Sequence, residues 1–206
     1  MIKIIESPRD AMQGIKEFIP TEMKAKYINS LLEVGFDIID FGSFVSPKAI
    51  PQLADTNLVT QLLKKSNSKT KLMAIVGNGR GAIQAWKYDI FDFLGFPSSI
   101  SPTFLQKNIN SNIEKSNRTV AELQEICLSK NKTLIVYITM AFGNPYGDIW
   151  NIDLVIQQIE KLRQLGIKII SLSDITNIAN PEIIAEVYST IYAQFPEIYF
   201  GFHLHT

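Results

Sequence analysis

The hydrophobic residues of this chain gather in seven short runs separated by more polar segments. The runs are rich in Ile, Val, Leu and Phe, which is typical of parallel strands that are buried on both faces. They occupy residues 3–6, 37–44, 71–77, 89–96, 133–142, 167–173 and 198–205. We therefore expect seven strands.

The polar segments between several runs have the period of amphipathic helices. Two of them, 21–35 and 151–166, end in a glycine that can stop a helix. The expected buried face is Met23, Tyr27, Leu31 and Val34 in the first, and Ile152, Val155, Ile159 and Leu162 in the second.

Three further helices are predicted from local signals. Asn180 followed by proline indicates a helix start. The Asp55 side chain is expected to cap a helix over 56–65. The stretch 121–130 is amphipathic and carries the only cysteine, Cys127, which we expect to be a small buried residue.

Strands that alternate with helices about every 30 residues predict βα units and a parallel sheet. A doubly wound open sheet and an eight-stranded barrel both satisfy this pattern. A complete barrel usually needs about 250 residues, and this chain of 206 residues ends after the seventh expected strand. We therefore predict an α/β fold, a TIM (β/α)8-type barrel truncated after the seventh strand, as a single domain over 1–206.

Composition narrows the partners and the compartment. The 20 basic and 20 acidic side chains cancel, so no net field attracts nucleic acid or an anionic membrane. No run of 18 apolar residues predicts a membrane span. One cysteine cannot form an internal disulfide, which favours a cytoplasmic location.

The most specific local signal lies at the end of the last expected strand. His203 and His205 are the only histidines in the chain. Side chains at positions i and i+2 of a strand point to the same face, so both imidazoles should project together. Imidazole is the commonest nitrogen ligand of metals. The sequence indicates either half of a metal site or two partly exposed histidines near the chain end.

A second signal, Arg9-Asp10, directly follows the first strand. In a barrel, the first and seventh strands are separated only by the eighth, so Asp10 would face the two histidines. A carboxylate with two imidazoles suits a divalent cation that keeps open positions for substrate. Arg9 would then supply a positive charge for a carboxylate or an enolate. The alternative is an ordinary surface pair in a turn.

Two more carboxylates lie in or just after strands. Asp40 falls inside the second run and Asp174 just after the sixth. A lone carboxylate in an apolar run is unfavourable unless it is paired or functional. A structural, hydrogen-bonded role remains the alternative for each. All these residues lie toward the carboxyl ends of strands, where barrel enzymes build their active sites.

Longer motifs occur in order along the whole chain. They are SPRDAMQG at 7–14, IPTE at 19–22, GSFVSPK at 42–48, PQLAD at 51–55, KNIN at 107–110, GNPYG at 143–147, SLSD at 171–174 and HLH at 203–205. This set resembles the hydroxymethylglutaryl-CoA lyases, and GSFVSPK with PQLAD is close to a signature of that family. The resemblance implies a barrel enzyme that cleaves 3-hydroxy-3-methylglutaryl-CoA into acetyl-CoA and acetoacetate.

The resemblance also implies roles for individual residues. Asp10, His203 and His205 would be ligands of a divalent metal cation, Mg²⁺ or Mn²⁺. Arg9 would contact the acyl-CoA substrate and stabilise the acetyl-CoA enolate, and Asp40 stands where the family usually has glutamate. Arg9, Asp40 and Asp174 are the catalytic candidates that the resemblance implies. The substrate-binding candidates are Tyr146, which would line the pocket, and Gln13, Ser43, Asn78 and Arg80 on the substrate side. A homodimer is a further expectation.

Two family features do not occur in the 206 residues. The Gly-Gly-Cys-Pro loop with its catalytic cysteine is absent, and so is the asparagine that completes the metal shell. Cys127, expected in a helix, is no replacement. We therefore expect this chain by itself to be inactive. Two alternatives stay open: a related acyl-CoA aldolase or condensing enzyme, and an inactive metal-binding fragment.

Overall fold

The computed structural model describes residues 2–65 and 68–205, in which seven strands alternate with helices. The strands are β1 (Ile5–Glu6), β2 (Ile38–Ser43), β3 (Lys71–Ile75), β4 (Phe93–Ser99), β5 (Thr133–Thr139), β6 (Ile169–Asp174) and β7 (Tyr199–Leu204). The helices are α1 (Pro8–Gln13), α2 (Thr21–Val34), the 3₁₀ turn η1 (Pro51–Leu53), α3 (Thr56–Gln61), α4 (Gly79–Ala85), α5 (Pro102–Ile109), α6 (Ile113–Ser129), α7 (Ile152–Gln164) and α8 (Pro181–Gln194).

The strands follow one another in the sheet in sequence order, from β1 to β7. The pairs β1–β2, β2–β3, β3–β4, β5–β6 and β6–β7 are parallel. This is the strand order of a (β/α) barrel, and it confirms the predicted fold class.

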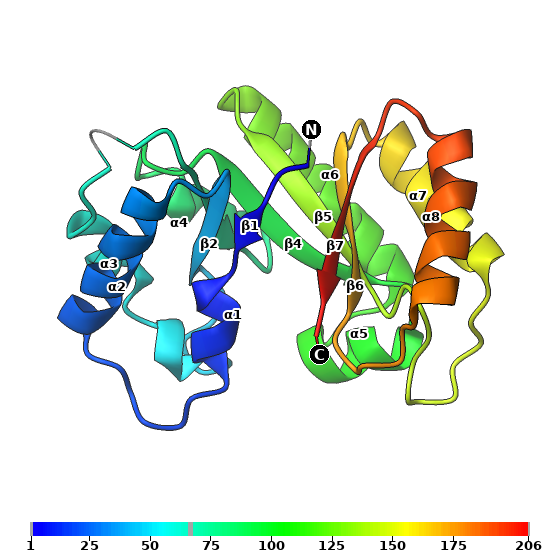
Figure 1. Ribbon diagram of the computed structural model, residues 1–206, viewed down its shortest axis with the longest axis horizontal. Helices are drawn as coiled ribbons and strands as arrows, with labels where there is room; N and C mark the ends of the chain where they lie inside the picture. Colours follow the sequence, from blue (N-terminus) through cyan, green and yellow to red (C-terminus); the bar gives the residue numbers. More distant parts are fainter. Residues whose placement is uncertain (1, 66–67, 206) are drawn as a thin grey trace. The chain divides into compact units, whose positions relative to one another are not determined.

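The chain divides into two compact units (Figure 1). The first comprises Met1–Gly95 with Ser129–Thr133, and the second comprises Phe96–Leu128 with Leu134–Thr206. In the first unit, β1 pairs with β2, and α2 contacts α3. In the second, α7 and α8 lie together beside β6 and β7 (Figure 1). The single-domain assignment remains a prediction.

Each unit has a core built on its strands. Ile39, Leu72 and Met73 are fully buried in the first unit, as are Val136 and Leu172 in the second. Strands covered on both faces explain why the sequence shows continuous apolar runs rather than alternation.

Two helix ends and one buried residue match the predictions. Gly35 ends α2 in the left-handed conformation at φ 89°, which glycine adopts without strain. The Asn180 side chain accepts a hydrogen bond from the Ile183 amide and caps α8. Cys127 lies buried in α6, as expected, and burial raises the pKa of its thiol to about 12.

The predicted buried face of α2 is wrong for three of its four residues, and only Leu31 is buried as predicted. Met23, Tyr27 and Val34 are 60%, 46% and 65% exposed. The other buried residues of this helix are Lys24, Ala25, Ile28 and Leu32. The buried face combines four apolar residues with Lys24, whose ammonium group is held inside by a partner from another element.

That partner is Asp55, and the prediction that its side chain caps α3 is wrong as well. Asp55 stands at the N-cap position, but its carboxylate makes no capping hydrogen bond. It accepts from Lys24 Nζ at 2.7 Å and from Thr21 Oγ1 at 2.8 Å. A buried ion pair between α2 and the start of α3 takes the place of a local cap.

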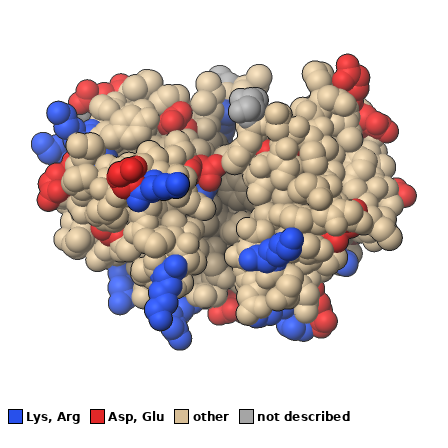
Figure 2. Space-filling model, turned by 90° about the horizontal axis from the view of Figure 1, so that it is seen from below, with Lys and Arg blue, Asp and Glu red and all other residues tan. Residues whose placement is uncertain are grey.

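The described surface carries charges of both signs. On the face drawn in Figure 2, basic and acidic side chains lie interspersed, as the balanced composition indicates. Within residues 2–65 and 68–205, no helix is long and apolar enough to cross a bilayer.

Candidate active site

Arg9 organises a cluster of polar side chains in the first unit. Its guanidinium donates to Asp40 Oδ2 from Nε at 3.0 Å and from Nη2 at 2.7 Å. Its Nη1 donates to Asp10 Oδ1 at 2.8 Å and to Gln13 Oε1 at 3.1 Å. The structure thus brings together four of the residues that the sequence singled out: Arg9, Asp10, Gln13 and Asp40.

Local backbone structure sets up this cluster. The short helix α1 begins with Pro8 at its first position, and it carries Arg9, Asp10 and Gln13 directly after β1. Asp40 lies on β2, where the register with β3 shifts between Asp40 and Gly42. Such an irregularity bends a strand and re-aims the side chains around it.

Burial gives the cluster its electrostatic weight. The side chain of Asp40 is 1% exposed and that of Arg9 is 11% exposed. An arginine held by two planar donors to one carboxylate has a fixed orientation. The guanidinium is therefore anchored on one side by Asp40, beside the more exposed carboxylate of Asp10.

His203 and His205 lie close together in the second unit. His203 lies on β7 and His205 directly after it, and their Nε2 atoms are 3.1 Å apart. This confirms that the i and i+2 side chains share a face. Two imidazoles bound at right angles to one ion, with bonds of about 2.1 Å, would place their nitrogens about 3 Å apart. The pair therefore has the spacing that a shared cation needs.

The ring of Tyr137 supports this arrangement. Its centroid lies 6.0 Å from that of His203, in an edge-to-face geometry. Tyr137 belongs to β5, and its side chain is nearly buried. This neighbour was not predicted, because an aromatic residue in an apolar strand is usually part of the core.

Asp174 ends β6 and orders the loop that follows. Its Oδ1 accepts from the Thr176 amide at 2.8 Å, and its Oδ2 accepts from the Ala179 amide at 2.6 Å. Burial raises the pKa of Asp174, but the hydrogen bonds from Ala179 and Thr176 outweigh it, so the pKa is lowered. Both oxygens hold backbone amides, which favours a structural role; a catalytic role remains a prediction.

Tyr146 lies in a loop after β5 that is held by hydrogen bonds of the Asn144 and Asp148 side chains. Asn144 Oδ1 accepts from the Tyr146 and Asp148 amides, each at 3.0 Å. Lys107 Nζ lies 4.8 Å from the centroid of the Tyr146 ring. Asp148 accepts from the Ser101 hydroxyl and from the hydroxyl of Thr103 at 2.7 Å. Sequence reasoning chose Tyr146 but missed Asn144 and Asp148, which hold it.

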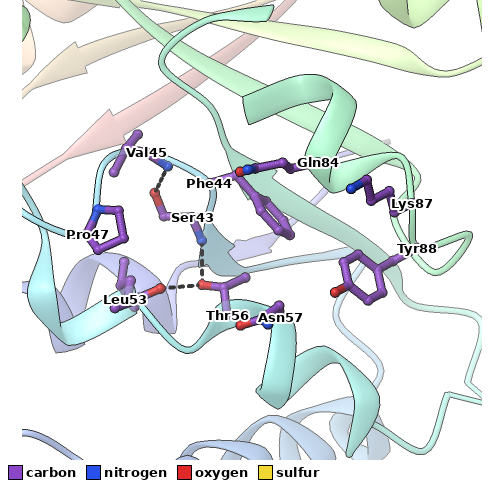
Figure 3. A pocket seen from close by; sticks show the side chains of 11 residues that line it. Ser43, Phe44, Val45, Pro47, Leu53, Thr56, Asn57, Gln84, Lys87 and Tyr88 are labelled. Carbon is purple, nitrogen blue, oxygen red and sulfur yellow. Dashed lines mark hydrogen bonds between the residues drawn. The ribbon is translucent and has the colours of Figure 1, made fainter. Parts of the chain in front are cut away.

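Ser43 lines a cavity of about 350 Å³ beside α3 and α4 (Figure 3). Its hydroxyl accepts from the Val45 amide at 3.3 Å, and its own amide donates to Thr56 Oγ1 at 3.0 Å. Phe44 and Tyr88 stack across the opposite side. Ser43 is therefore committed to local hydrogen bonds, and contact with a substrate remains a prediction.

The last two substrate-side candidates lie at the start of α4. Asn78 Oδ1 accepts from the Gly81 amide at 3.0 Å and caps the helix. Arg80 follows two residues later and is exposed. A Cβ on Gly81 would lie 2.5 Å from the Phe44 carbonyl oxygen, so this helix packs directly on the end of β2. Contacts of Asn78 and Arg80 with substrate stay predictions.

A buried polar network behind the Arg9 cluster was not visible in the sequence. Gln52 Oε1 accepts from the Ile19 amide, and its Nε2 donates to the carbonyls of Ile15 and Glu17 at 3.0 and 2.8 Å. Lys24 Nζ donates to the Gln52 carbonyl. Gln52 thereby fixes the segment that follows Gln13. In the sequence, only its position in the PQLAD motif marked Gln52 as a residue of interest.

Comparison with known proteins identifies the family. The sequence matches the family described as HMGL-like over residues 2–206. The chain belongs to this family.

Relatives in the HMGL-like family carry consistent names. The hydroxymethylglutaryl-CoA lyase of Bacillus subtilis is 33% identical over 198 residues, which cover 96% of this chain and 66% of that protein. The mitochondrial hydroxymethylglutaryl-CoA lyase of Homo sapiens is 29% identical over 208 residues, which cover 99% of this chain and 62% of that protein. The chain thus spans about two thirds of the length of these relatives.

Solved structures of the HMGL-like family share the fold. The crystal structure of the Bacillus subtilis HMG-CoA lyase matches with a TM-score of 0.94 and 31% identity, over 99% of this chain and 68% of that one. An Acinetobacter baumannii HMG-CoA lyase, solved in complex with coenzyme A and 3-methylmalate, matches with a TM-score of 0.89 and 28% identity, over 97% and 66%.

Proposed function

We propose that this chain provides the metal-binding and substrate-binding part of a carbon–carbon lyase that cleaves 3-hydroxy-3-methylglutaryl-CoA into acetyl-CoA and acetoacetate. Its membership of the HMGL-like family supports this, as do the names of its relatives. The observation that carries the proposal is the 3.1 Å spacing of the Nε2 atoms of His203 and His205 at the end of β7. In the first unit, the Arg9 guanidinium that Asp40 holds gives further support.

We assign the metal site to Asp10, His203 and His205. A carboxylate and two neutral imidazoles form a donor set that suits a divalent cation such as Mg²⁺ or Mn²⁺. The spacing of the two Nε2 atoms fits two ligands of one ion. When bound, the cation would supply Lewis acidity toward the oxygens of the substrate.

Arg9 carries the electrostatic part of the reaction. A base takes the proton of the substrate hydroxyl as the bond between C2 and C3 breaks. The electron pair stays on the acetyl-CoA fragment as an enolate, which becomes acetyl-CoA when it takes up a proton. A guanidinium that is already oriented by Asp40 stabilises this charge without reorganising. Asp40 is accordingly a positioning residue, shorter by one methylene than the family's usual glutamate.

The remaining candidates would define the acyl-CoA pocket. Gln13 lies within hydrogen-bond distance of Arg9, and Tyr146 is held by the ordered loop after β5. Ser43, Asn78 and Arg80 would contact the acyl-CoA chain, and Asp174 would keep the loop after β6 in place. Acyl-CoA recognition is supported by the Acinetobacter baumannii relative, which was solved with coenzyme A.

Metal binding tests the ligand assignment in the chain itself. Titration with Mn²⁺, followed by calorimetry, should show one site that is lost in His203→Ala and in Asp10→Ala. Asp153→Ala, which removes an exposed carboxylate on α7, should leave the affinity unchanged. Equal Mn²⁺ affinity in all three variants would exclude these ligands.

Turnover tests the reaction. A chimaera of residues 1–206 followed by the remaining third of the Bacillus subtilis relative should release acetoacetate from 3-hydroxy-3-methylglutaryl-CoA. Arg9→Ala should reduce this rate about 10²–10³-fold while Mn²⁺ binding persists. Release of another carbonyl product would favour the related aldolase or condensing enzyme instead.

A further inference from the structure

Ser173 is a buried polar residue on the strand next to that of His203, in the second unit. It lies on β6 and is 1% exposed. Within residues 2–65 and 68–205, its side-chain oxygen has no hydrogen-bond partner. A buried hydroxyl without a partner destabilises a protein, and native structures rarely keep one. The strand that borders the proposed metal ligands therefore keeps a hydroxyl that lowers its stability.

The register of the sheet places Ser173 beside His203. The two residues are paired between the parallel strands β6 and β7, and paired residues of neighbouring strands point to the same face of a sheet. The ring of Tyr137, on β5, contacts the His203 ring and therefore lies on that face as well. Tyr137 is paired with Ser171, and Ser173 follows Ser171 by two positions, so it shares the face.

The partners of Ser173 on the other side of β6 are already engaged. Thr139 is paired with Ser173 from β5, but its hydroxyl donates to the Ser98 carbonyl at 2.7 Å. The backbone carbonyl of Ser173 accepts from the Ala141 amide at 3.3 Å, so its unsatisfied group is the side chain. On the β7 side, the polar side chain in register with Ser173 is the imidazole of His203.

A histidine that binds a metal through Nε2 carries its proton on Nδ1, and proteins ordinarily give this N–H an oxygen to bind. We propose that Ser173 is a positioning residue for His203, whose Nδ1–H donates to the Ser173 hydroxyl oxygen when Nε2 faces the cation. The inference rests on the metal site of the proposed function. Serine has a single side-chain torsion with three staggered rotamers, so its hydroxyl can turn toward β7 while the strand stays in place.

Calorimetric titration of the 206-residue chain with Mn²⁺ tests this role. Ser173→Ala should weaken Mn²⁺ binding about tenfold, because loss of a group that orients a metal ligand typically costs roughly 10–100-fold in affinity. Ser171→Ala is the matched control. It deletes a buried hydroxyl from the same face of the same strand, but the residue paired with it on β7 is Gly201. This control should leave the affinity unchanged.

Two further measurements separate positioning from a purely structural role. Without metal, Ser173→Ala should melt at or above the temperature of the parent chain, because it deletes an unsatisfied hydroxyl. In nuclear magnetic resonance spectra of the Mg²⁺-saturated parent, the Nδ1–H of His203 should give a resolved signal, since a hydrogen-bonded ring proton exchanges slowly with water. At equal saturation, Ser173→Ala should broaden this signal and leave that of His205 unchanged.

The outcomes distinguish this proposal from the metal assignment on which it rests. If the parent chain binds no Mn²⁺, the metal assignment fails, and the role of Ser173 fails with it. If the parent binds Mn²⁺ and His203→Ala does not, equal affinity in Ser173→Ala and Ser171→Ala leaves the metal site standing and shows that the positioning role is wrong. A metal-free Ser173→Ala chain that melts well below the parent would show that Ser173 is a structural residue instead.

Discussion

Replacing Lys24 with methionine should lower the free energy of unfolding by about 3–5 kcal/mol. Lys24 is 2% exposed, and its Nζ lies 2.7 Å from Asp55 Oδ1. It also lies 4.1 Å from the centroid of the Phe18 ring. Methionine preserves the length and the apolar stem of the side chain, so the substitution removes the charge with little change in packing.

The magnitude follows from what the substitution leaves behind. Two unit charges 2.7 Å apart attract by about 6 kcal/mol at an effective dielectric constant of about 20. Desolvation of the ammonium group offsets part of this in the parent chain. In the variant, Asp55 stays 8% exposed, and Thr21 remains as its side-chain donor. Its uncompensated charge accounts for the expected loss.

Urea unfolding followed by circular dichroism measures the effect. Lys26→Met, on the exposed side of the same helix, is the matched control and should change stability by less than about 0.5 kcal/mol. The double variant Lys24→Met/Asp55→Asn should lose less than the sum of the single variants, because the two residues share one interaction. A Lys24→Met loss within about 1 kcal/mol of the control would refute the reasoning.

Three further outcomes are expected. Gly81→Ala should destabilise the chain by about 1–3 kcal/mol, since its Cβ would lie 2.5 Å from the Phe44 carbonyl oxygen; Gly14→Ala, where nothing lies within 4 Å, is the control in the same unfolding assay. Asp174→Asn should cost about 1–3 kcal/mol at pH 7. Because the folded pKa of Asp174 is lowered, its contribution is present above the ordinary value of 3.8 and is lost as the pH falls through the folded pKa, so the two unfolding curves should converge in acid. Cys127, whose pKa is raised to about 12 by burial, should resist alkylation at pH 8 until urea unfolds the chain, as mass spectrometry would show.

The strands were predictable because burial on both faces leaves continuous apolar runs. The fourth strand shows where this signal fails. The apolar run 89–96 predicted its position, but β4 is Phe93–Ser99. Its second half contains Ser98 and Ser99, which are fully buried. Ser99 Oγ donates to the Thr139 carbonyl at 2.8 Å. A buried polar residue that is satisfied by a distant partner leaves no local apolar signal.

The helices show the same division between local and long-range determinants. Gly35 and Asn180 act within one turn, so their roles could be predicted. The orientation of α2 depends on Asp55, which is 31 residues from Lys24. The spacing of apolar residues alone could not predict that α2 buries its lysine.

Part of the candidate site was predictable for a geometric reason. Side chains at positions i and i+2 of a strand share a face, which placed His203 and His205 together. Active-site residues of barrels lie toward the carboxyl ends of strands, which is where Asp40 meets Arg9. Asn144 and Asp148 were missed because they act on backbone amides and hydroxyls of a loop. No pattern of residue types marks such contacts in advance.

The hydrogen bonds that hold the loop after β5 affect which substitutions the family can accept. Asp148 binds the Ser101 hydroxyl and both the amide and the hydroxyl of Thr103, at the first turn of α5. These positions are more than 40 residues apart in sequence. A homologue that replaces Asp148 loses its hydrogen bonds to both hydroxyl groups at once. Substitutions at 101, 103 and 148 should therefore occur together. Recombination that separates the two segments would then disrupt the loop carrying Tyr146 even where each half is native.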